Sequence, residues 1–479
     1  MTETAAAGRR LAFPDGFVWG VGTSSYQVEG GVHEDGRGES IWDRFSHTPG
    51  RVANGDDGDV TSDQFHRWRE DVELMASLGV RAYRFSLAWP RIQPDGRGPL
   101  NEPGFAYYDR LIDALLERGI EPCPTLYHWD LPQPLEDEGG WLARATVERF
   151  GEFAAHCFRR FGDRVRTWFT INEPWVAATL GYRLGIHAPG HRDLGEAVTA
   201  SHHFLLGHGA AVEAFRASGR DGRIGIVLSM SPTEPASDSD EDRAAAVGSD
   251  GYTNRWFLDP VLHGRYPEDM LELFERLTGP LRAIHPDDAG RIGTPSDLLG
   301  VNYYARRVIS AGTADGGLPW TVRRPSPDVP WTDTGWEITP TRLTDLLVDL
   351  TRDVGDLPIL ITENGAVFFD APRPDGRTTD GGRIAFIRSH LAAVHRAIEL
   401  GAPVAGYFYW SLLDNFEWAE GFRSRFGLVH VDYPTGRRLV KGSGHAYATI
   451  IAANGFDATD DELGGRLIEP SERPAGPGQ

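Results

Sequence analysis

The chain has 479 residues, of which 40% are hydrophobic and 11% aromatic, so it is long enough and apolar enough to form a large core. Its net charge of −21, from 48 basic and 69 acidic side chains, excludes nucleic acid and anionic membrane surfaces as partners, because its long-range field repels them. The chain has two cysteines, too few for a disulfide framework, no apolar run long enough to span a membrane, and no apolar secretory segment near its N-terminus, so we expect a cytoplasmic protein.

Eight short apolar segments follow one another along the chain, each rich in β-branched or aromatic residues. Nearly continuous apolarity is typical of strands buried on both faces, as in parallel sheets. The segments span residues 17–25, 82–89, 121–128, 167–174, 223–230, 298–304, 358–365 and 404–411. Between them, apolar residues recur at helical spacing from Phe65, Tyr107 and Arg383, and each of these patterns closes at a glycine.

Strands that alternate with helices in this way predict an α/β fold, a single (β/α)8 (TIM) barrel with long βα loops. We place the catalytic domain at residues 11–453 and expect flexible termini at 1–10 and 455–479. The polar segments 231–245 and 311–335 are predicted to be loop insertions.

The rival fold is a doubly wound open sheet with a phosphate loop at residues 20–25, GVGTSS. That stretch lacks the third glycine and a good helix behind it, so it is a poor nucleotide fingerprint and we expect no cofactor. We also expect no metal site. The histidines at 202, 203 and 208 do not share one helix face, and the acidic loop 54–59 lacks the closing Glu of an EF-hand.

Two glutamates end predicted strands in similar surroundings. Glu173 follows Asn172 in FTINEPW, and Glu363 precedes Asn364 in LITENG. Because the chemistry of such barrels lies where the strands end, both carboxyl groups are expected in one barrel mouth. Glycoside hydrolysis needs two carboxyl groups on opposite sides of the anomeric carbon, so the pair predicts a glycosidase.

Around these two motifs the chain resembles glycoside hydrolase family 1, the β-glucosidases, over residues 11–453. In the family's order it carries FVWGVGTSSYQVEG, YRFSLAWPRI, TLYHWDLPQ, TINEPW, NYY, LITENG and YFYWSLLDNFEWAEGF. The resemblance implies that Glu173 is the general acid/base and that Glu363 is the nucleophile. It also implies sugar-binding roles for Gln27, His128, Trp129, Asn172, Trp410, Glu417 and Trp418, and places Arg84, Asn302 and Tyr304 beside the nucleophile.

These implied roles agree with elementary electrostatics. A cation and a phenol donor at Arg84 and Tyr304 would keep Glu363 ionised, as a nucleophile must be. The like charge of Glu363 would raise the pKa of Glu173 until Glu363 is esterified. Asn172 could donate to the sugar 2-hydroxyl, a bond that strengthens in the oxocarbenium-like transition state.

The resemblance implies a retaining β-glucosidase that cleaves terminal non-reducing β-D-glucosyl residues from β-glucosides and short β-gluco-oligosaccharides through a covalent glycosyl-enzyme. Glu417 can bridge two hydroxyls of either epimer, so β-galactosides and β-fucosides stay candidate substrates, and it would repel the phosphate of a 6-phosphoglycoside. Glu173 argues against the myrosinases, which carry Gln there. His445 departs from the family pattern, which has Trp, and this departure concerns local packing.

Three alternatives stay open at this point. One is a catalytically silent sugar-binding protein on the same barrel. Another is a transglycosidase, in which an alcohol replaces water, and the third is a cofactor-dependent enzyme built on GVGTSS. The sequence leaves open whether the protein is a monomer or a homo-oligomer, and which aglycone it prefers.

Overall fold

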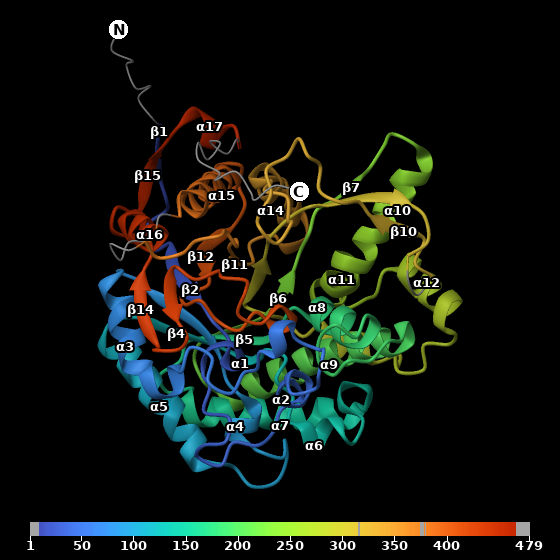
Figure 1. Ribbon diagram of the computed structural model, residues 1–479. Helices are drawn as coiled ribbons and strands as arrows, with labels where there is room; N and C mark the ends of the chain where they lie inside the picture. The colour runs from blue at the N-terminus through green and yellow to red at the C-terminus, as the bar shows by residue number, and fades with distance from the viewer. Residues whose placement is uncertain (1–8, 315–316, 374–377, 379, 466–479) are drawn as a thin grey trace.

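A computed structural model describes residues 9–314, 317–373, 378 and 380–465 (Figure 1). Within these residues, eight parallel strands close into a barrel in the order β11-β12-β2-β3-β4-β5-β6-β8. Their bounds are β2 (Val18–Gly22), β3 (Ala82–Ser86), β4 (Glu121–Tyr127), β5 (Thr167–Asn172), β6 (Arg223–Ser229), β8 (Leu298–Asn302), β11 (Ile359–Asn364) and β12 (Val404–Trp410). Each strand lies inside one of the predicted apolar segments, so the predicted (β/α)8 barrel is confirmed.

Long helices between the strands cover the outside of the barrel (Figure 1). They are α3 (Gln64–Ser77), α5 (Glu102–Glu117), α7 (Arg144–Phe161), α9 (Leu194–Ser218), α11 (Trp256–His263), α14 (Pro340–Val354), α15 (Gly381–Glu399) and α16 (Gly442–Ala452). The helical patterns predicted from Phe65, Tyr107 and Arg383 correspond to α3, α5 and α15.

Shorter elements occupy the connections between strands and helices. The helices in these connections are α1 (Ser25–Val28), α2 (Ile41–Ser46), α4 (Trp89–Ile92), α6 (Gln133–Glu136), α8 (Pro174–Ala178), α12 (Glu268–Thr278) and α13 (Asp288–Ile292). Single 3-10 or π turns are η1 (Ala53–Gly55), η2 (Gly140–Leu142), η3 (Thr179–Arg183), η4 (Gly251–Arg255) and η6 (Trp418–Glu420). A hairpin follows β12 and consists of β13 (Val429–Asp432) and β14 (Arg437–Val440). Among the described residues, no helix combines the length and the apolarity that crossing a membrane requires.

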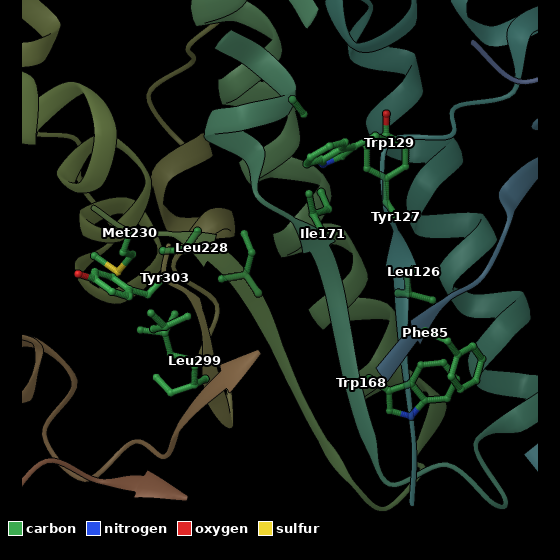
Figure 2. Packing of buried hydrophobic residues seen from close by; sticks show 14 of the residues in the cluster. Phe85, Leu126, Tyr127, Trp129, Trp168, Ile171, Leu228, Met230, Leu299 and Tyr303 are labelled. Carbon is green, nitrogen blue, oxygen red and sulfur yellow. The ribbon is translucent and has the colours of Figure 1, made fainter. Parts of the chain in front are cut away.

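The strands are buried on both faces, as their apolar runs predict. One side chain from each of seven strands joins a small separate cluster, with Val18 of β2 packed against it: Ala82, Cys123, Phe169, Val227, Leu298, Leu360 and Phe408. A cluster to which the strands contribute one side chain each fills the barrel interior. Outward-facing side chains such as Phe85, Trp168 and Leu299 belong instead to the large cluster under the helices, part of which Figure 2 shows.

The two predicted loop insertions contain regular structure, which corrects the prediction. Short strands β7 (Thr233–Pro235), β9 (Arg307–Ala311) and β10 (Trp320–Val322) form a three-stranded sheet, and α10 (Asp240–Asp250) packs beside it (Figure 1). Strands this short carry no periodic signal of their own. They form because β9, which ends where the insertion 311–335 begins, pairs on one edge with β10 from that insertion and on the other edge with β7 from the insertion 231–245.

The described parts of the termini also differ from the predicted flexible ends. β1 (Arg9–Ala12) pairs antiparallel with β15 (Gly455–Ala458), and α17 (Asp460–Leu463) follows with Thr459 and Glu462 forming a capping box. Backbone pairing between the two ends of the domain therefore orders residues that a composition-based argument assigned to tails. The remaining residues of those predicted tails, 1–8 and 466–479, lie outside the described residues.

Candidate active site

Each of the two predicted catalytic glutamates follows an irregularity in its strand. The pairing of β5 with β6 shifts register between Phe169 and Asn172, and the pairing of β11 with β8 shifts between Ile361 and Glu363. A bulge of this kind inserts a residue and re-aims the side chains that come after it. Phe169 and Asn172 can therefore both face the barrel axis, although regular alternation would place them on opposite faces.

Glu363 lies buried between a cation and a phenol. The Arg84 guanidinium donates to Glu363 Oε1 at 2.6 Å, and the Tyr304 hydroxyl donates to Glu363 Oε2 at 2.7 Å. Arg84 projects from β3 and is fully buried, and Tyr304 follows the end of β8. Both contacts stabilise the ionised form of the carboxyl group, because each donor gains most from a full negative charge on its acceptor.

Glu173 is joined to the same cluster through two amides. Asn302 Nδ2 donates to Glu173 Oε1 at 3.0 Å and lies 3.1 Å from Asn172 Oδ1. Asn172 Oδ1 also accepts a 2.6 Å bond from the second terminal nitrogen of Arg84. The chain of contacts from Glu363 through Arg84, Asn172 and Asn302 to Glu173 holds the two carboxyl groups in one rigid network.

Burial and charge both act on Glu173. Burial is the larger cause and the negative charge of Glu363 the second, and together they raise the pKa of Glu173 to about 8. The sequence argument named only the charge, so it missed the larger cause. Glu173 also has a positive φ of 47°, in the left-handed region that non-glycine residues rarely adopt, directly before α8.

Glu417 stands at the other end of the site, held by Gln27. Gln27 Nε2 donates to Glu417 Oε2 at 3.2 Å, and Ser24 orients that amide by donating to Gln27 Oε1 at 2.7 Å. Burial, followed by the charges of Glu363 and Glu173, raises the pKa of Glu417 to about 8. A buried carboxyl group with few protein donors has free acceptor capacity for the hydroxyls of a ligand.

His128 presents one ring nitrogen that has no partner. Asn172 Nδ2, which can only donate, lies 3.1 Å from His128 Nε2, so Nε2 accepts and the proton of the neutral ring is on Nδ1. Burial and then the charge of Arg84 hold the pKa of His128 well below its usual value. Nδ1 is buried without a hydrogen-bond partner among the described residues.

Aromatic rings form the walls around these polar groups. Trp129 donates its Nε1–H to Asn172 O at 2.8 Å. The ring centres of Trp129 and Trp418 are 4.6 Å apart, and those of His128 and Trp410 are 5.8 Å apart. Both Trp129 and Trp418 have positive φ values, 79° and 51°. Flat apolar faces beside a few directed polar groups are the arrangement that binds sugar rings, whose C–H faces are apolar and whose edges carry hydroxyls.

The structure brings the predicted site residues together at one mouth of the barrel. A cavity of about 480 Å³ is lined by His128, Trp129, Glu173, Tyr304, Glu363, Trp410, Glu417 and Trp418. The other predicted residues, Gln27, Arg84, Asn172 and Asn302, stand behind that lining and hold it through the hydrogen bonds described above. Further lining residues were not predicted: Trp175, His187, Ser229, Arg307, Trp336 and Phe426. Trp175 lies within the TINEPW motif and could have been found there, whereas Trp336 comes directly after the insertion 311–335 and belongs to no motif.

The residues weighed for metal binding do not join this cavity. His202 bonds Tyr266 and Asp288, His203 faces the carbonyl of Trp141, and His208 contacts Thr170. These separate partners make all three histidines part of the packing around α9. In the described part of the chain, His47, Asp57 and Asp59 bring ligand atoms within 4.8 Å of one another, but they lie on an open surface loop.

Comparison with known proteins gives one consistent answer. The model of the family "Glycosyl hydrolase family 1" matches residues 9–456. The sequence is 46% identical over 446 residues to beta-glucosidase A of Thermotoga maritima, covering 93% of this chain and 99% of that one. It is 49% identical over 453 residues to thermostable beta-glucosidase B of Thermobispora bispora, covering 93% of this chain and 92% of that one.

Solved structures agree with the sequence matches. The family 1 β-glucosidase of Thermotoga maritima in complex with isofagomine lactam superposes with a TM-score of 0.90 at 45% identity, covering 94% of this chain and all of that one (100%). The AHE enzyme of Alicyclobacillus herbarius superposes with a TM-score of 0.90 at 49% identity, covering 93% of this chain and 98% of that one.

Proposed function

Since the chain belongs to glycosyl hydrolase family 1, we propose that it is a retaining β-glucosidase that removes terminal non-reducing β-D-glucosyl residues by double displacement. The observation that supports this most directly is the pairing of two buried carboxyl groups with opposite protonation needs. Glu363 carries a cation and a phenol donor on its two oxygens, whereas burial raises the pKa of Glu173 to about 8. At neutral pH such a pair offers one nucleophile and one acid.

In the first step, Glu363 attacks the anomeric carbon while the bond to the leaving oxygen breaks. Glu173 gives its proton to that oxygen, so the aglycone leaves as a neutral alcohol. The side-chain carbonyl oxygen of Asn172 accepts hydrogen bonds from Arg84 and Asn302, which fixes the side chain. Its NH2 group can then donate one hydrogen bond to His128 and the other to the sugar 2-hydroxyl.

In the second step, a water molecule attacks the anomeric carbon of the glycosyl-enzyme. Esterification has removed the charge of Glu363, so the pKa of Glu173 falls and its carboxylate takes the proton of the water. The ester bond breaks, Glu363 leaves as a carboxylate, and the sugar leaves with its β configuration retained. An alcohol in place of water gives transglycosylation by the same route.

The sugar site favours glucose without excluding its epimers. Glu417 and Gln27 meet one end of the sugar, and Glu417 can accept from two neighbouring hydroxyls in either configuration. The Thermotoga maritima relative has been solved in complex with galacto-hydroximolactam, and a Thermotoga neapolitana relative is a 1,4-beta-D-glucan glucohydrolase, 45% identical to this chain. These relatives support β-galactosides and short β-glucans, including cellulose fragments, as further substrates.

The decisive experiment compares Glu363→Gln with the wild type on an aryl β-glucoside. We expect the rate to fall by at least about a thousandfold, because the nucleophile is lost while sugar binding is kept. Proton NMR of the first-formed sugar should show the β anomer, as expected for carboxyl groups about 5 Å apart. Equal rates for the two proteins would favour the catalytically silent sugar-binding alternative, and an α product would exclude the retaining mechanism.

A second variant tests the acid/base role by itself. Glu173→Gln should lose most activity on a glucoside with a poor leaving group. The rate of the first step should fall far less on a dinitrophenyl glucoside, because its leaving group needs no proton.

The cytoplasmic location and the oligomeric state stay predictions, which fractionation and light scattering would test.

A further inference from the structure

The active-site cavity is bordered by a cation that has no anionic partner among the described residues. Arg307, the first residue of β9, lines this cavity and is half-buried. Its Nε is buried without a hydrogen-bond partner, and no carboxylate lies within 4 Å of its guanidinium among the described residues. Burial lowers the pKa of Arg307, and no nearby carboxylate offsets that effect. Its neighbour Arg306 differs, since it pairs with both Glu234 and Glu337.

A second donor without a partner lies against the same guanidinium. The Arg307 guanidinium stands 5.0 Å from the centre of the Trp175 ring, and Trp175 also lines the cavity. The indole Nε1–H of Trp175 is buried and makes no hydrogen bond among the described residues. Neither of these two N–H groups has accessible surface, whereas the terminal nitrogens of Arg307 are not among the buried atoms, so those terminal nitrogens are the donors that an acceptor-bearing ligand in the cavity would meet.

Trp175 places this pair of donors on the leaving-group side of the site. Trp175 is two residues after Glu173 and belongs to α8, which starts at Pro174. Glu173 protonates the leaving oxygen in the proposed reaction, so the residues that extend the cavity from Glu173 border the aglycone. The sugar-facing groups Gln27, Glu417 and Trp418 come from the opposite segments, after β2 and after β12.

Other charges around the cavity do not neutralise Arg307. Glu337 is held by Arg306, Glu420 pairs with Arg423, and Glu363 pairs with Arg84. The protein as a whole carries −21, so an anion gains nothing from the long-range field and must be held by a local cation.

From these observations we propose that Arg307 and Trp175 form an anion-accepting aglycone subsite, which favours β-glucosides whose aglycone carries a carboxylate. The inference rests on the proposed β-glucosidase function and adds the substrate class of the same site. The guanidinium supplies a charge-assisted pair of donors from its terminal nitrogens. The Trp175 face packs against an aromatic aglycone.

The test measures kcat/KM on paired aryl β-glucosides that differ only in a carboxylate or a carboxamide, attached to the ring directly or through a short spacer. The variants are Arg307→Gln, which removes the charge, and Arg307→Lys, which keeps it. Arg307→Gln should lower kcat/KM on the carboxylate substrates by roughly tenfold or more, and on the carboxamides by less than about threefold. Arg307→Lys should recover part of the loss. Since each ratio compares variant with wild type on one substrate, leaving-group reactivity cancels.

Two further measurements keep the result decisive. The exposed Arg352→Gln removes the same charge outside the cavity and should change both substrate classes equally. A free aryl carboxylate should inhibit the wild type more strongly than the matching aryl carboxamide, a readout that needs no folded variant. Equal effects of Arg307→Gln on both classes, or inhibition of the wild type by the carboxylate no stronger than by the carboxamide, would overturn the subsite while leaving the proposed function intact. A wild type inactive on every glucoside would instead overturn the proposed function.

Discussion

Two regions of this protein bury charged groups, and they hold them in opposite ways. The catalytic carboxyl cluster consists of Glu173, Glu363 and Glu417, and among the described residues only Glu363 of these three forms an ion pair, with the buried Arg84. The second region, which we call the Asp414 network, surrounds one buried carboxylate with cations. Lys441 Nζ donates to Asp414 Oδ1 at 2.9 Å, and Arg425 donates to Asp414 Oδ2 at 2.8 Å.

The pKa values show what this difference does. Burial alone would raise the pKa of Asp414, but Lys441, His430 and Arg425 hold it well below its usual range. In the catalytic cluster nothing comparable offsets burial, and the pKa values of Glu173 and Glu417 rise to about 8. Asp414, which several cations contact, keeps its charge in spite of burial, whereas Glu173, which no cation in the described part of the chain contacts directly, keeps its proton and is available for acid catalysis.

The largest expected effect comes from removing the cation of the Asp414 network. Lys441 is fully buried and also donates to Asp370 Oδ2 at 3.0 Å, so Lys441→Met leaves two buried carboxylates short of a partner. We expect the free energy of unfolding to fall by about 3–5 kcal/mol, measured by denaturant unfolding, with kcat per folded molecule nearly unchanged. Arg352→Met at an exposed pair is the control and should change stability by less than about 0.5 kcal/mol. A loss below about 1 kcal/mol for Lys441→Met would contradict this account of the network.

Neutralising one carboxyl group in each region should shift stability in opposite directions. The folded pKa of Glu173 is raised, so its ionisation opposes folding more strongly as pH rises from about 4 to about 8. Glu173→Gln should therefore be more stable than the wild type by a few kcal/mol at pH 8, with the difference vanishing near pH 4.

The folded pKa of Asp414 is lowered, so its contribution to stability is present above its unfolded pKa and is lost as pH falls through the folded one. Asp414→Asn should therefore destabilise the protein at neutral pH and matter less in acid. Thermal unfolding of both variants across pH tests the pair. If both variants changed stability in the same direction, the number of cations around each carboxyl group would not explain the difference between the two regions.

The sequence predicts the barrel well, because buried strands leave a local signal, whereas most of the candidate site residues are named through the resemblance to the family. Apolar runs mark the buried strands, and Glu173 and Glu363 end two of them beside an asparagine. Features that depend on several strands coming together leave no such signal in the sequence. The register shifts before Asn172 and Glu363 depend on pairing with neighbouring strands, and the bridging role of Asn302 depends on two strands meeting.

The same reason explains what the sequence argument missed. The sheet of β7, β9 and β10 depends on pairing between two insertions, so the position of Arg307 on the cavity wall could not be read from composition. Burial of Glu173 is likewise a property of the assembled site. A sequence argument therefore finds the charge that raises its pKa and misses the larger cause.

The pH dependence of kcat/KM tests the raised pKa of Glu173 in the catalytic cluster. Glu173 has to be protonated in the first step, and its pKa is raised to about 8, so kcat/KM should be lost as pH rises through that value, by about tenfold per unit. Glu417 titrates in the same range, so its deprotonation contributes to the same limb. Glu417→Gln removes one negative charge beside Glu173, so the pKa of Glu173 should fall. The loss of kcat/KM at high pH should therefore remain in this variant but begin at a lower pH. A limb that disappears in this variant would assign the titration to Glu417 instead.

The smallest expected effect tests how Glu363 is kept ionised with so few cations. Burial raises the pKa of Tyr304 well above its usual value, so its hydroxyl stays protonated and donates to Glu363. Tyr304→Phe removes that donor but leaves the Arg84 contact, so we expect kcat to fall by about tenfold, with less than about a threefold change in the Kd of a glucose-like inhibitor.

The adjacent Tyr303 is a matched control, because it is also buried but donates to Thr339 O at 2.8 Å, away from the carboxyl groups. Tyr303→Phe should leave kcat unchanged and affect only stability. If Tyr304→Phe behaves in the same way as this control, then Arg84 alone keeps Glu363 charged, and the phenol has no part in the chemistry. If inhibitor binding is lost together with kcat, Tyr304 holds the sugar as well as the nucleophile.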